Sequence, residues 1–523
     1  MRMFGVALLM AAAGMLPAAV TVEQYHVHDF SFRGQTAGNP FDAELTGEFT
    51  GPGGIRIVVP GFYDGDNVWK VRFAATVPGQ WSLRTISPVA ALNNQTEPAI
   101  TATANTNKAI HGGLLVDPLH RTHFVYEDGT RYFLMGYEAD WLWGADMKDP
   151  ERKVMHHLID QIDARGFNHV LVNIYAHDTT WAKGQTNQWD YGPSAVYLFG
   201  GTNDKPDHAH LNPEFFKIYD GMMQALQDKG IVANVMLKVY NKMVNWPLAG
   251  SRDEARYFQY VTARYQAYSN VVWDFSKEAY YERDKNLEKR LIDLVRATDG
   301  YHRLTTAHDN DVYDWDTSLN SNLDFRTDQE HDHWMEMALF DRNLRPWPYI
   351  NSELYYERGV DDLPTYPRKQ DWQDQVRGAY EVYLSGGYFV YYYSNTAWDL
   401  VKPDPEPPGM SRFQILKESL SSLPYWRMEP KPELAVGGPC LALPGQIYAF
   451  FVKPGPAGNR GTEITVNLSG LPGSASVQWI NTWTGERSDG KVDRPGVYQF
   501  RRPGSFGDAP GLLIVRSNNR EGD

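Results

Sequence analysis

Two glutamates in this 523-residue sequence stand where apolar segments end, and together they could perform acid–base chemistry. Glu278 follows the segment 271–277, and Glu353 follows the segment 348–352. A pair of carboxyl groups can hydrolyse a glycosidic bond, because one protonates the leaving oxygen while the other acts on the far side of the sugar carbon. Carboxyl groups ~5–5.5 Å apart give retention of configuration, and a gap of ~6.5–9.5 Å gives inversion. We expect retention, with Glu353 as the nucleophile and Glu278 as the acid and then the base.

The region that must position these glutamates alternates between apolar runs and helical patterns. Predicted strands lie at 132–137, 169–175, 232–239, 271–275, 304–307, 323–327, 348–352 and 388–393. Predicted helices lie at 149–165, 213–229, 252–269, 284–298, 334–343 and 371–385, with a last one at 411–423. Alternation of this kind over about 270 residues predicts a (β/α)8 TIM barrel. The alternative, an open doubly wound sheet, usually carries a Gly-rich phosphate loop after a strand, and this sequence has none.

The carboxyl ends of the predicted strands turn polar and aromatic, and in a TIM barrel these ends form the active site. The fourth and seventh strands lie across the barrel mouth from each other, so Glu278 and Glu353 could share one substrate. Aromatic side chains near these ends could stack on a sugar, and polar ones could bind its hydroxyl groups. The candidates for substrate binding are Asp140, Trp141, His177, Lys238, Tyr240, Lys277, Asn351, Tyr355 and Trp398. Core packing or a solvated strand end is the alternative interpretation of each.

The sequence neighbours of the two glutamates bear on their charge. Burial would raise the pKa of Glu278 and the adjacent Lys277 would lower it, so the sequence leaves its protonation state open. Asn351 and Ser352 could hold Glu353 ionised by hydrogen bonds. His331 is a candidate to orient a glutamate or bind a hydroxyl group, although a purely structural histidine is the commoner case.

Two regions of a different pattern flank the predicted barrel, and a targeting segment precedes them. Residues 1–19 combine Arg2, an apolar run and small residues near Ala18, which is the pattern of a secretory signal peptide. Short alternating runs broken by Gly and Pro predict β-sandwich domains at 20–106 and 429–523, with the barrel at 107–428. We therefore expect an exported protein, either periplasmic or extracellular.

Three stretches of the predicted barrel together carry a resemblance. They are YFLMGY at 132–137 with Asp140 and Trp141, VWD at 272–274 before Glu278, and NSE at 351–353. Through them the region resembles the apiosidase-like barrels of the clan-A-type glycoside hydrolases. The resemblance implies an acid/base at Glu278 and a nucleophile at Glu353. Related enzymes usually carry Asn before the acid/base, where it touches the sugar 2-hydroxyl. In this sequence Lys277 takes that position. Asp274 is therefore kept as a second candidate for the catalytic acid, in reserve behind Glu278.

The flanking regions carry resemblances of their own. The stretches GNPF at 38–41, GFYDG at 61–65, WKVRF at 69–73 and GQW at 79–81 resemble a β-sandwich domain of unknown function that often precedes such barrels. WINTWTGE at 479–486 resembles the collagen-binding-like β-sandwich that follows them. These domains could bind glycan chains through Trp69, Trp479 or Trp483, or they could pack against the barrel and frame its cleft.

Composition excludes several other classes of protein. The 50 Lys and Arg against 64 Asp and Glu give a net charge of −14, which disfavours a nucleic-acid-binding protein. No apolar run after the leader is long enough to span a membrane, and the single Cys440 can form no intrachain disulfide. We expect no cofactor and no metal, because the HxH patterns at 208–210 and 331–333 are weak zinc signals.

Together these features predict a secreted glycoside hydrolase that acts on a carbohydrate substrate, a polysaccharide or an oligosaccharide. Two other interpretations stay open: a catalytically silent glycan-binding protein that keeps the barrel as a scaffold, and a lyase that uses the same carboxyl groups. Product analysis separates a hydrolase from a lyase, because a lyase leaves an unsaturated sugar. The sequence sets neither the sugar nor the oligomeric state.

Overall fold

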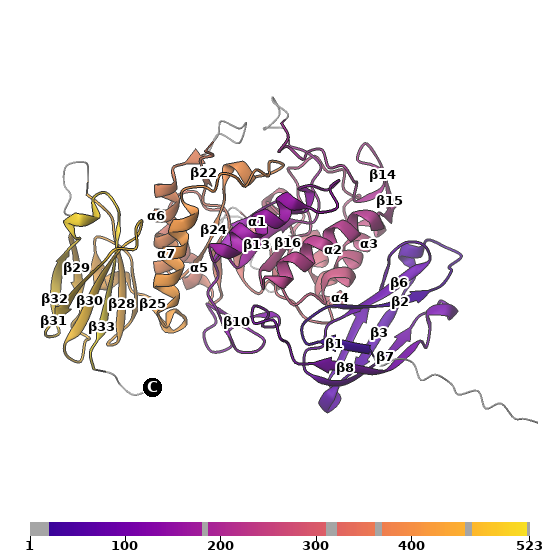
Figure 1. The fold of residues 1–523 in the computed structure, drawn as a ribbon, viewed down its shortest axis with the longest axis horizontal. Helices are drawn as coiled ribbons and strands as arrows, with labels where there is room; N and C mark the ends of the chain where they lie inside the picture. The colour runs from indigo at the N-terminus through magenta and orange to yellow at the C-terminus, as the bar shows by residue number, and fades with distance from the viewer. Residues whose placement is uncertain (1–19, 180–186, 310–321, 361–368, 456–462, 520–523) are drawn as a thin grey trace, which may run out of the picture.

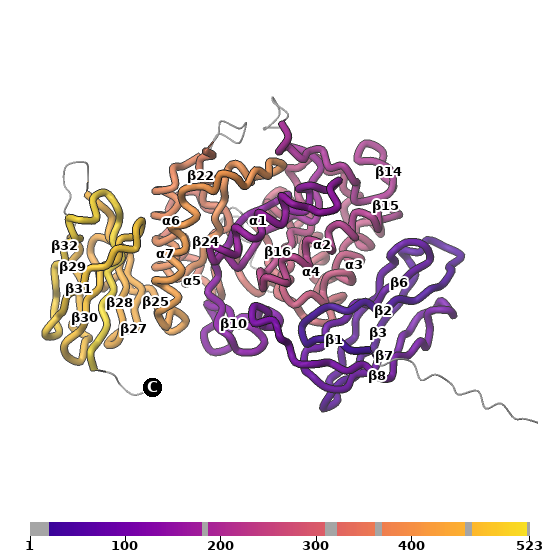
Figure 2. Tube along the Cα trace, viewed as in Figure 1, coloured from indigo at the N-terminus to yellow at the C-terminus, as the bar shows by residue number. Residues whose placement is uncertain are grey.

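The computed structural model of the chain describes residues 20–179, 187–309, 322–360, 369–455 and 463–519. In Figure 1 a barrel of strands and helices lies between two groups of mainly antiparallel strands, one from each end of the chain. Figure 2 follows the same path, with the indigo N-terminal strands and the yellow C-terminal strands on opposite sides of the barrel. This arrangement confirms the predicted TIM barrel with flanking sandwich domains. The predicted signal peptide, residues 1–19, lies outside the described residues.

Parallel strands form the barrel in the order β18-β17-β16-β13-β12-β24-β21-β20-β19. β18 (Thr305–Thr306) and β19 (His308–Asp309) are halves of one strand, so pairing of β18 with β17 and of β19 with β20 closes the ring. The other strands are β12 (Gly136–Glu138), β13 (His169–Asn173), β16 (Val232–Met236), β17 (Val271–Asp274), β20 (Arg326–Asp328), β21 (Tyr349–Asn351) and β24 (Tyr388–Tyr391). All of their residues are buried, as parallel strands covered by helices require.

Helices cover the outside of the barrel, close to the predicted positions. They are α1 (Lys153–Ala164), α2 (Pro213–Asp228), α3 (Arg252–Tyr265), α4 (Lys285–Thr298), α5 (Trp334–Leu344), α6 (Trp372–Leu384) and α7 (Met410–Ser421). Local sequence sets several of their starts: the side chains of Asn212, Ser251 and Asp284 accept hydrogen bonds from the first-turn N–H groups of α2, α3 and α4. The first helical residue of α2 is Pro213, which suits that position because it needs no backbone donor.

The first barrel strand is shorter than predicted. Residues 131–132 form β11 (Arg131–Tyr132), which pairs antiparallel with β10 (Phe124–Tyr126), and β10 pairs with β9 (Leu114–Val116). Phe124 packs against Phe325 and Tyr388, with ring centroids 5.3 and 5.8 Å apart. Because these two rings lie at the starts of β20 and β24, the small sheet covers the end of the barrel opposite the carboxyl ends of its strands.

Two further pairs of short strands lie outside the barrel sheet. The hairpin β14 (Phe199–Thr202) and β15 (Lys205–Leu211) follows β13, and β22 (Tyr356–Glu357) pairs with β23 (Lys369–Gln370) after β21. Both pairs lie in loops that leave the carboxyl ends of barrel strands. They therefore belong to the half of the barrel in which TIM-barrel active sites lie.

The N-terminal domain consists of two sheets. One has the order β1-β8-β7-β3-β4 and the other the order β2-β6-β5. Their strands are β1 (Val20–Glu23), β2 (His28–Arg33), β3 (Thr46–Thr50), β4 (Arg56–Pro60), β5 (Phe62–Tyr63), β6 (Val68–Phe73), β7 (Gly79–Ile86) and β8 (Thr96–Thr103). Phe49 stacks on Phe73 with centroids 3.9 Å apart, and Trp69 and Trp81 are buried around them. Trp69 therefore packs the domain core and presents no open face to a glycan.

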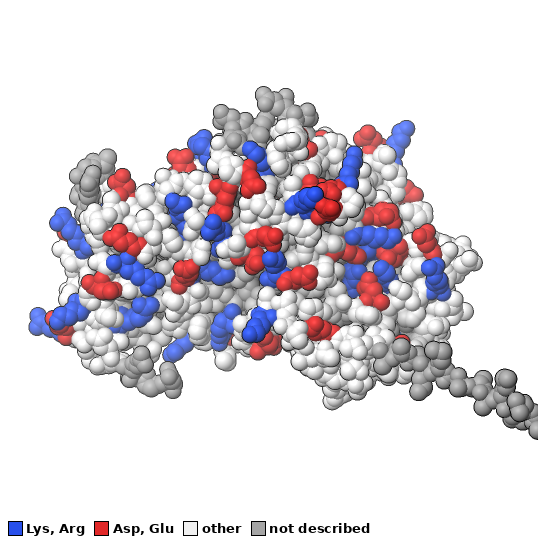
Figure 3. Space-filling model, viewed as in Figure 1, with Lys and Arg blue, Asp and Glu red and all other residues white. Residues whose placement is uncertain are grey.

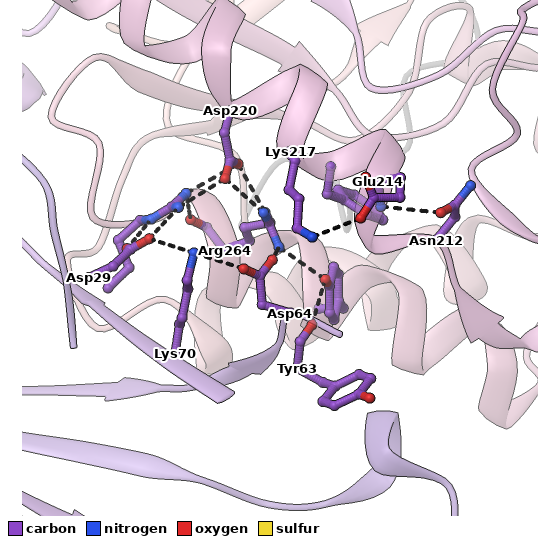
Figure 4. Close-up of polar contacts among 12 residues, drawn as sticks. Asp29, Tyr63, Asp64, Lys70, Asn212, Glu214, Lys217, Asp220 and Arg264 are labelled. Carbon is purple, nitrogen blue, oxygen red and sulfur yellow. Dashed lines mark hydrogen bonds and ion pairs between the residues drawn. The ribbon is translucent and has the colours of Figure 1, made fainter. Parts of the chain in front are cut away.

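Buried charges join the N-terminal domain to the barrel. Arg72 of β6 donates to Asp29 and to Asp220 of α2, and Arg264 of α3 donates to Asp220 at 2.9 and 2.7 Å and to Asp64 at 2.8 Å. Figure 4 shows Asp220 reaching from its helix toward Arg264, with Asp64 on the domain side. Arg72 and Arg264 are 4% and 0% exposed, so these ion pairs are shielded from solvent.

The C-terminal domain also has two sheets, with the orders β25-β27-β28-β33-β30-β31 and β26-β29-β32. Its strands are β25 (Glu429–Pro430), β26 (Ala435–Val436), β27 (Cys440–Leu443), β28 (Ile447–Val452), β29 (Glu463–Asn467), β30 (Ala475–Asn481), β31 (Arg487–Val492), β32 (Val497–Arg501) and β33 (Gly511–Ser517). Phe451 stacks flat on Tyr380 of α6 at 5.1 Å. Trp479 is buried in the domain, and Trp483 packs edge-on against Trp372, so both rings serve packing.

The described surface carries charges of both signs. Figure 3 shows Lys and Arg interspersed with Asp and Glu across the face in view, with no extended basic patch on it. Among the described residues, no helix is long and apolar enough to cross a membrane. The predicted domain boundaries at residues 106 and 428 stay predictions.

Removal of the shared charge at the domain junction tests whether the two parts fold as one unit. Asp220→Asn leaves Arg72 and Arg264 buried with a neutral partner, and we expect a loss of ~3–5 kcal/mol in the free energy of unfolding. Lys217→Met is the matched control on the same helix, because its pair with Glu214 is exposed and should contribute less than about 1 kcal/mol. Urea unfolding followed by tryptophan fluorescence measures both, and equal losses would contradict the prediction.

Candidate active site

The barrel brings both predicted catalytic glutamates to the carboxyl ends of its strands. The segment after β17 continues beside the end of β16, because the Lys277 N–H donates to the Lys238 carbonyl at 2.9 Å. Glu278 follows with a left-handed backbone (φ 57°) and is 8% exposed. Glu353 lies two residues beyond β21, and its N–H donates to the Asn351 side-chain oxygen at 3.3 Å. Burial is the main cause that raises the pKa of Glu278, and the charge of Glu353 adds to it.

Glu353 is held by groups that favour its ionised form. The Tyr356 hydroxyl donates to Oε1, and His331 Nε2 lies 3.9 Å from the same oxygen. Lys277 Nζ lies 3.5 Å from Oε2. Burial acts to raise the pKa of Glu353, but the Lys277 ammonium and the His331 ring outweigh it and hold this pKa well below its usual range. A carboxylate in this state is available as a nucleophile at neutral pH.

Glu278 has the opposite character. Burial raises its pKa, and the charges of Lys242 and Lys277 offset only part of that increase. Its Oε2 atom is buried and accepts no hydrogen bond from the residues that the structure describes. A protonated carboxyl group with an uncommitted oxygen is suited to donate a proton. The sequence left the direction of the pKa shift of Glu278 open, and burial is the largest cause of its increase.

A cluster of carboxyl groups surrounds the Lys277 ammonium. Lys277 Nζ donates to Glu138, which ends β12, and lies 3.4 Å from Asp140. The Tyr392 hydroxyl donates to Asp140 at 2.8 Å. Glu138 and Asp140 are both fully buried. Lys277 therefore joins the ends of the first, fourth and seventh barrel strands.

Asp274, the reserve acid of the sequence analysis, is bound into the barrel wall. Its Oδ1 accepts the N–H groups of Ser276 and His308 at 3.2 and 3.0 Å, and its Oδ2 accepts Asn234 Nδ2 at 3.0 Å. Burial raises the pKa of Asp274 to about 7. Because both oxygens hold neighbouring strands together, Asp274 acts as a structural group beneath the site.

Aromatic rings form one wall of the site. Trp398, which has a left-handed backbone (φ 54°), packs against Tyr356 and Tyr392 with centroids 4.8 and 6.1 Å apart. Tyr355 stacks on His331 at 4.8 Å. These contacts place Trp398 and Tyr355 beside groups that touch Glu353, as expected of candidates for substrate binding. Their role in binding stays a prediction.

The other predicted binding residues fall into two groups. Asp140, Lys277 and Asn351 contact the carboxyl cluster or Glu353, as described above, whereas four other candidates have partners of their own. Trp141 is fully buried and stacks on Trp143 at 5.3 Å. Lys238 pairs with buried Glu254 at 2.7 Å, Tyr240 donates to Glu282 at 2.8 Å, and His177 lies 3.2 Å from the Tyr175 hydroxyl. The packing of Trp141 and Lys238 fits a scaffold role better than sugar contact.

Several residues of the site were absent from the predicted set. Tyr392 directly follows β24 in the run of three tyrosines at 391–393, so its position just beyond a strand end was a usable signal. Glu138 ends β12. Tyr356 and Lys242 lie in loops whose path the strand pattern does not determine. Burial lowers the pKa of Lys242 to about 8, so this ammonium loses its proton only slightly above neutral pH.

The described residues contain no cluster of three or more His, Cys, Asp or Glu arranged to hold a metal ion. The HxH histidines at 208–210 have other contacts: His208 Nε2 lies 2.8 Å from the Asn245 carbonyl, and His210 Nδ1 lies 2.7 Å from Asp207. The arrangement therefore offers an ionised carboxylate at Glu353, a carboxyl group of raised pKa at Glu278, and the buried Lys277 ammonium beside Glu353.

Comparison of the sequence with known protein families identifies the family of this barrel. The family described as "Apiosidase-like, catalytic domain" matches residues 120–429. This chain belongs to the apiosidase-like catalytic domain family. It is a glycoside hydrolase, and the matched residues include every element of the barrel together with Glu278 and Glu353. Residues 21–88 match the "Domain of unknown function (DUF5060)".

Solved structures are similar to this apiosidase-like chain over most of its length. A candidate glycoside hydrolase from Bacteroides vulgatus ATCC 8482 shares 21% identity at a TM-score of 0.79, covering 95% of this chain and 99% of its own. A family 5 glycoside hydrolase from the same organism shares 16% identity at a TM-score of 0.61, covering 79% and 94%. A further glycoside hydrolase shares 17% identity at a TM-score of 0.62, covering 79% of this chain and 98% of its own. At these identities the likeness shows the fold. No curated protein matches the sequence.

The raised pKa of Asp274 predicts how the stability of this apiosidase-like protein depends on pH. The folded protein holds the Asp274 proton up to about pH 7, whereas the unfolded chain releases it near its usual pKa of about 3.9. The contribution of Asp274 to stability therefore decreases as pH rises from about 4 to about 7, and then levels off. Asp274→Asn has no proton to lose, so its stability relative to the natural protein should rise by roughly 1–4 kcal/mol over this interval. Urea unfolding of both proteins at a series of pH values measures the difference, and a constant offset would contradict the prediction.

Proposed function

We propose that this protein is an exported hydrolase that cleaves a glycosidic bond in a polysaccharide or oligosaccharide by a retaining double displacement. Glu353 attacks the anomeric carbon and forms a glycosyl–enzyme bond while Glu278 protonates the leaving oxygen. Glu278 then removes a proton from water, which hydrolyses that bond and releases a sugar of unchanged anomeric configuration. The signal pattern in residues 1–19 supports export.

One observation supports this mechanism above the others: the environments of the two carboxyl groups push their pKa values apart. A nucleophile must be ionised, and Glu353 is paired with Lys277 and bonded by Tyr356. A general acid must carry its proton, and burial favours the protonated form of Glu278. A silent glycan-binding barrel has no need of this difference, which favours the hydrolase over that alternative.

The family name makes apiosides the first substrates to test. The charged groups of the site are nearly balanced, with Lys242 and Lys277 facing Asp140 and Glu353. A neutral sugar therefore suits the site at least as well as an acidic one. Trp398, Tyr356 and Tyr392 pack on one another and are buried, so they support the Glu353 side of the site and leave little ring surface for a sugar.

Hydrolysis by Glu353 is tested by screening plant, algal and bacterial glycans, with aryl apiosides included, and by comparing Glu353→Gln with the natural protein. We expect the substitution to lower kcat on any substrate found by at least about 10³-fold, while binding of that substrate persists. Glu357→Gln is the matched control: Glu357 is a buried glutamate four residues later, bonded to Tyr391 and to the Gly409 N–H, and burial raises its pKa to about 7.

Three outcomes would contradict the proposed hydrolase. Full turnover by Glu353→Gln would remove Glu353 from the mechanism. Products that contain an unsaturated sugar would assign a lyase. Binding without turnover across the whole screen, in a protein that is folded by circular dichroism, would favour a glycan-binding protein.

The role of Glu278 predicts a dependence on pH and on the leaving group. Because the acid must keep its proton, kcat/KM should fall as pH rises through the pKa of Glu278, and Glu278→Ala should lack this basic limb. The variant should lose about 10²–10⁴-fold on glycosides with poor leaving groups and far less on those with good ones. Added azide should restore turnover and give a glycosyl azide of unchanged configuration. A glycosyl azide of inverted anomeric configuration would overturn the retaining mechanism.

A further inference from the structure

Lys277 stands where the resemblance leads us to expect an asparagine that touches the sugar, but its side chain points into the protein. It is 1% exposed, and its ammonium lies among carboxyl groups from two other barrel strands. Glu138 and Asp140 follow the first strand, and Glu353 follows the seventh. The Tyr392 ring lies 5.4 Å from Nζ and covers one side of the charge. Lys277 is therefore enclosed and has little surface left to meet a substrate.

Three carboxyl groups around one ammonium cannot all be ionised without excess negative charge in a buried space. The cluster resolves this by keeping a proton on one of them. Burial raises the pKa of Glu138 well above its usual range, and the nearby charge of Asp140 adds to the increase. Asp140 stays ionised, since Lys277, Lys242 and the Tyr392 hydroxyl outweigh its burial and lower its pKa. Lys277 thus faces two carboxylates and one carboxylic acid.

The two oxygens of Glu353 are held from different sides. Oε1 receives the Tyr356 hydroxyl and faces His331, and Oε2 faces Lys277 at 3.5 Å. Tyr356 is neutral, so its hydrogen bond orients Glu353 without supplying a full charge. Lys277 supplies that charge from a position fixed by its bond to Glu138. Lys277 therefore supplies the charge on one oxygen, and together with Tyr356 on the other it sets the orientation of the carboxylate.

We propose that Lys277 is a positioning residue that holds Glu353 ionised and oriented for attack, from a place fixed by its contacts with Glu138 and Asp140. This inference rests on the proposed function in one respect, namely that Glu353 is the nucleophile. It replaces the sequence-based expectation that Lys277 binds substrate. Loss of Lys277 should therefore lower kcat, and it should leave KM for the same glycoside within about threefold.

The charge state of Glu353 can be measured without any substrate. Infrared titration of the carboxylate band, taken as the difference between a protein and its Glu353→Gln counterpart, isolates this one group. In the natural protein Glu353 should stay ionised down to about pH 4. In Lys277→Met, which keeps the side-chain length without the charge, a protonation step should enter the range above pH 4, because an opposite charge within ~4–6 Å shifts a carboxyl pKa by about 1–3.

Two further variants keep the test decisive if Lys277→Met folds poorly. The double variant Lys277→Met with Asp140→Asn removes the ammonium together with one of the carboxylates that it pairs with, which is less disruptive than leaving that buried charge alone. It should show the same upward shift for Glu353. Lys277→Arg retains a charge and should keep Glu353 ionised. Lys238→Met is the matched control for loss of a buried lysine, because Lys238 pairs with Glu254 outside the cluster and its loss should leave the Glu353 titration in place.

Activity provides the second measurement once a glycoside is found. The acid limb of kcat/KM should move to higher pH by at least about one unit in Lys277→Met, so that activity below the optimum falls at least tenfold further than activity at the optimum. An unchanged Glu353 titration in Lys277→Met, or an equal shift in Lys238→Met, would overturn the proposal even in an active enzyme. A shifted Glu353 titration in Lys277→Met supports the proposal. If the titration shifts but the natural protein hydrolyses no glycoside, the result contradicts the proposed function and leaves the positioning role of Lys277 supported.

Discussion

A lysine ammonium sealed from water inside a barrel is stable only while oppositely charged groups surround it, and this condition governs the site. Lys277 meets it through Glu138, Asp140 and Glu353, which come from the ends of the first and seventh strands while Lys277 follows the fourth. The contacts are possible because the barrel closes and holds these strand ends at fixed distances. The same contacts that make the lysine tolerable leave Glu353 charged, so stability and reactivity share one set of groups.

Most of the fold was predictable from local pattern. Continuous apolar runs marked the barrel strands, and helical patterns placed the starts of α3 and α4 to within a residue. The first strand was misplaced because Tyr132 is apolar in pattern but pairs with β10, a contact that depends on how the chain folds back. The hairpin of β14 and β15 was missed for a similar reason, since its strands are largely polar and exposed on one side.

The two glutamates of the site were predictable from the sequence, whereas the residues that surround them were less so. Glu278 and Glu353 each follow a barrel strand, and that position alone located them. Whether Trp141 lines a cleft or packs a core cannot be read from its type, because both places favour aromatic rings, and it packs on Trp143. Lys277 adjoins Glu278 in sequence, but its ammonium contacts Glu138, Asp140 and Glu353, which come from other barrel strands. Sequence neighbours were therefore a poor guide to electrostatic neighbours.

The junction between the N-terminal domain and the barrel has a consequence for how this enzyme can be divided. Asp220, on an outer helix of the barrel, is shared by one arginine from each part, and Arg72 also donates to the backbone carbonyl of Arg264 at 3.0 Å. A gene trimmed to the matched family segment would expose this helix face with Arg264 and Asp220 stripped of half their partners. These contacts lead us to expect that the smallest autonomous catalytic unit is larger than the matched family segment, and that the N-terminal domain and the barrel are best expressed together.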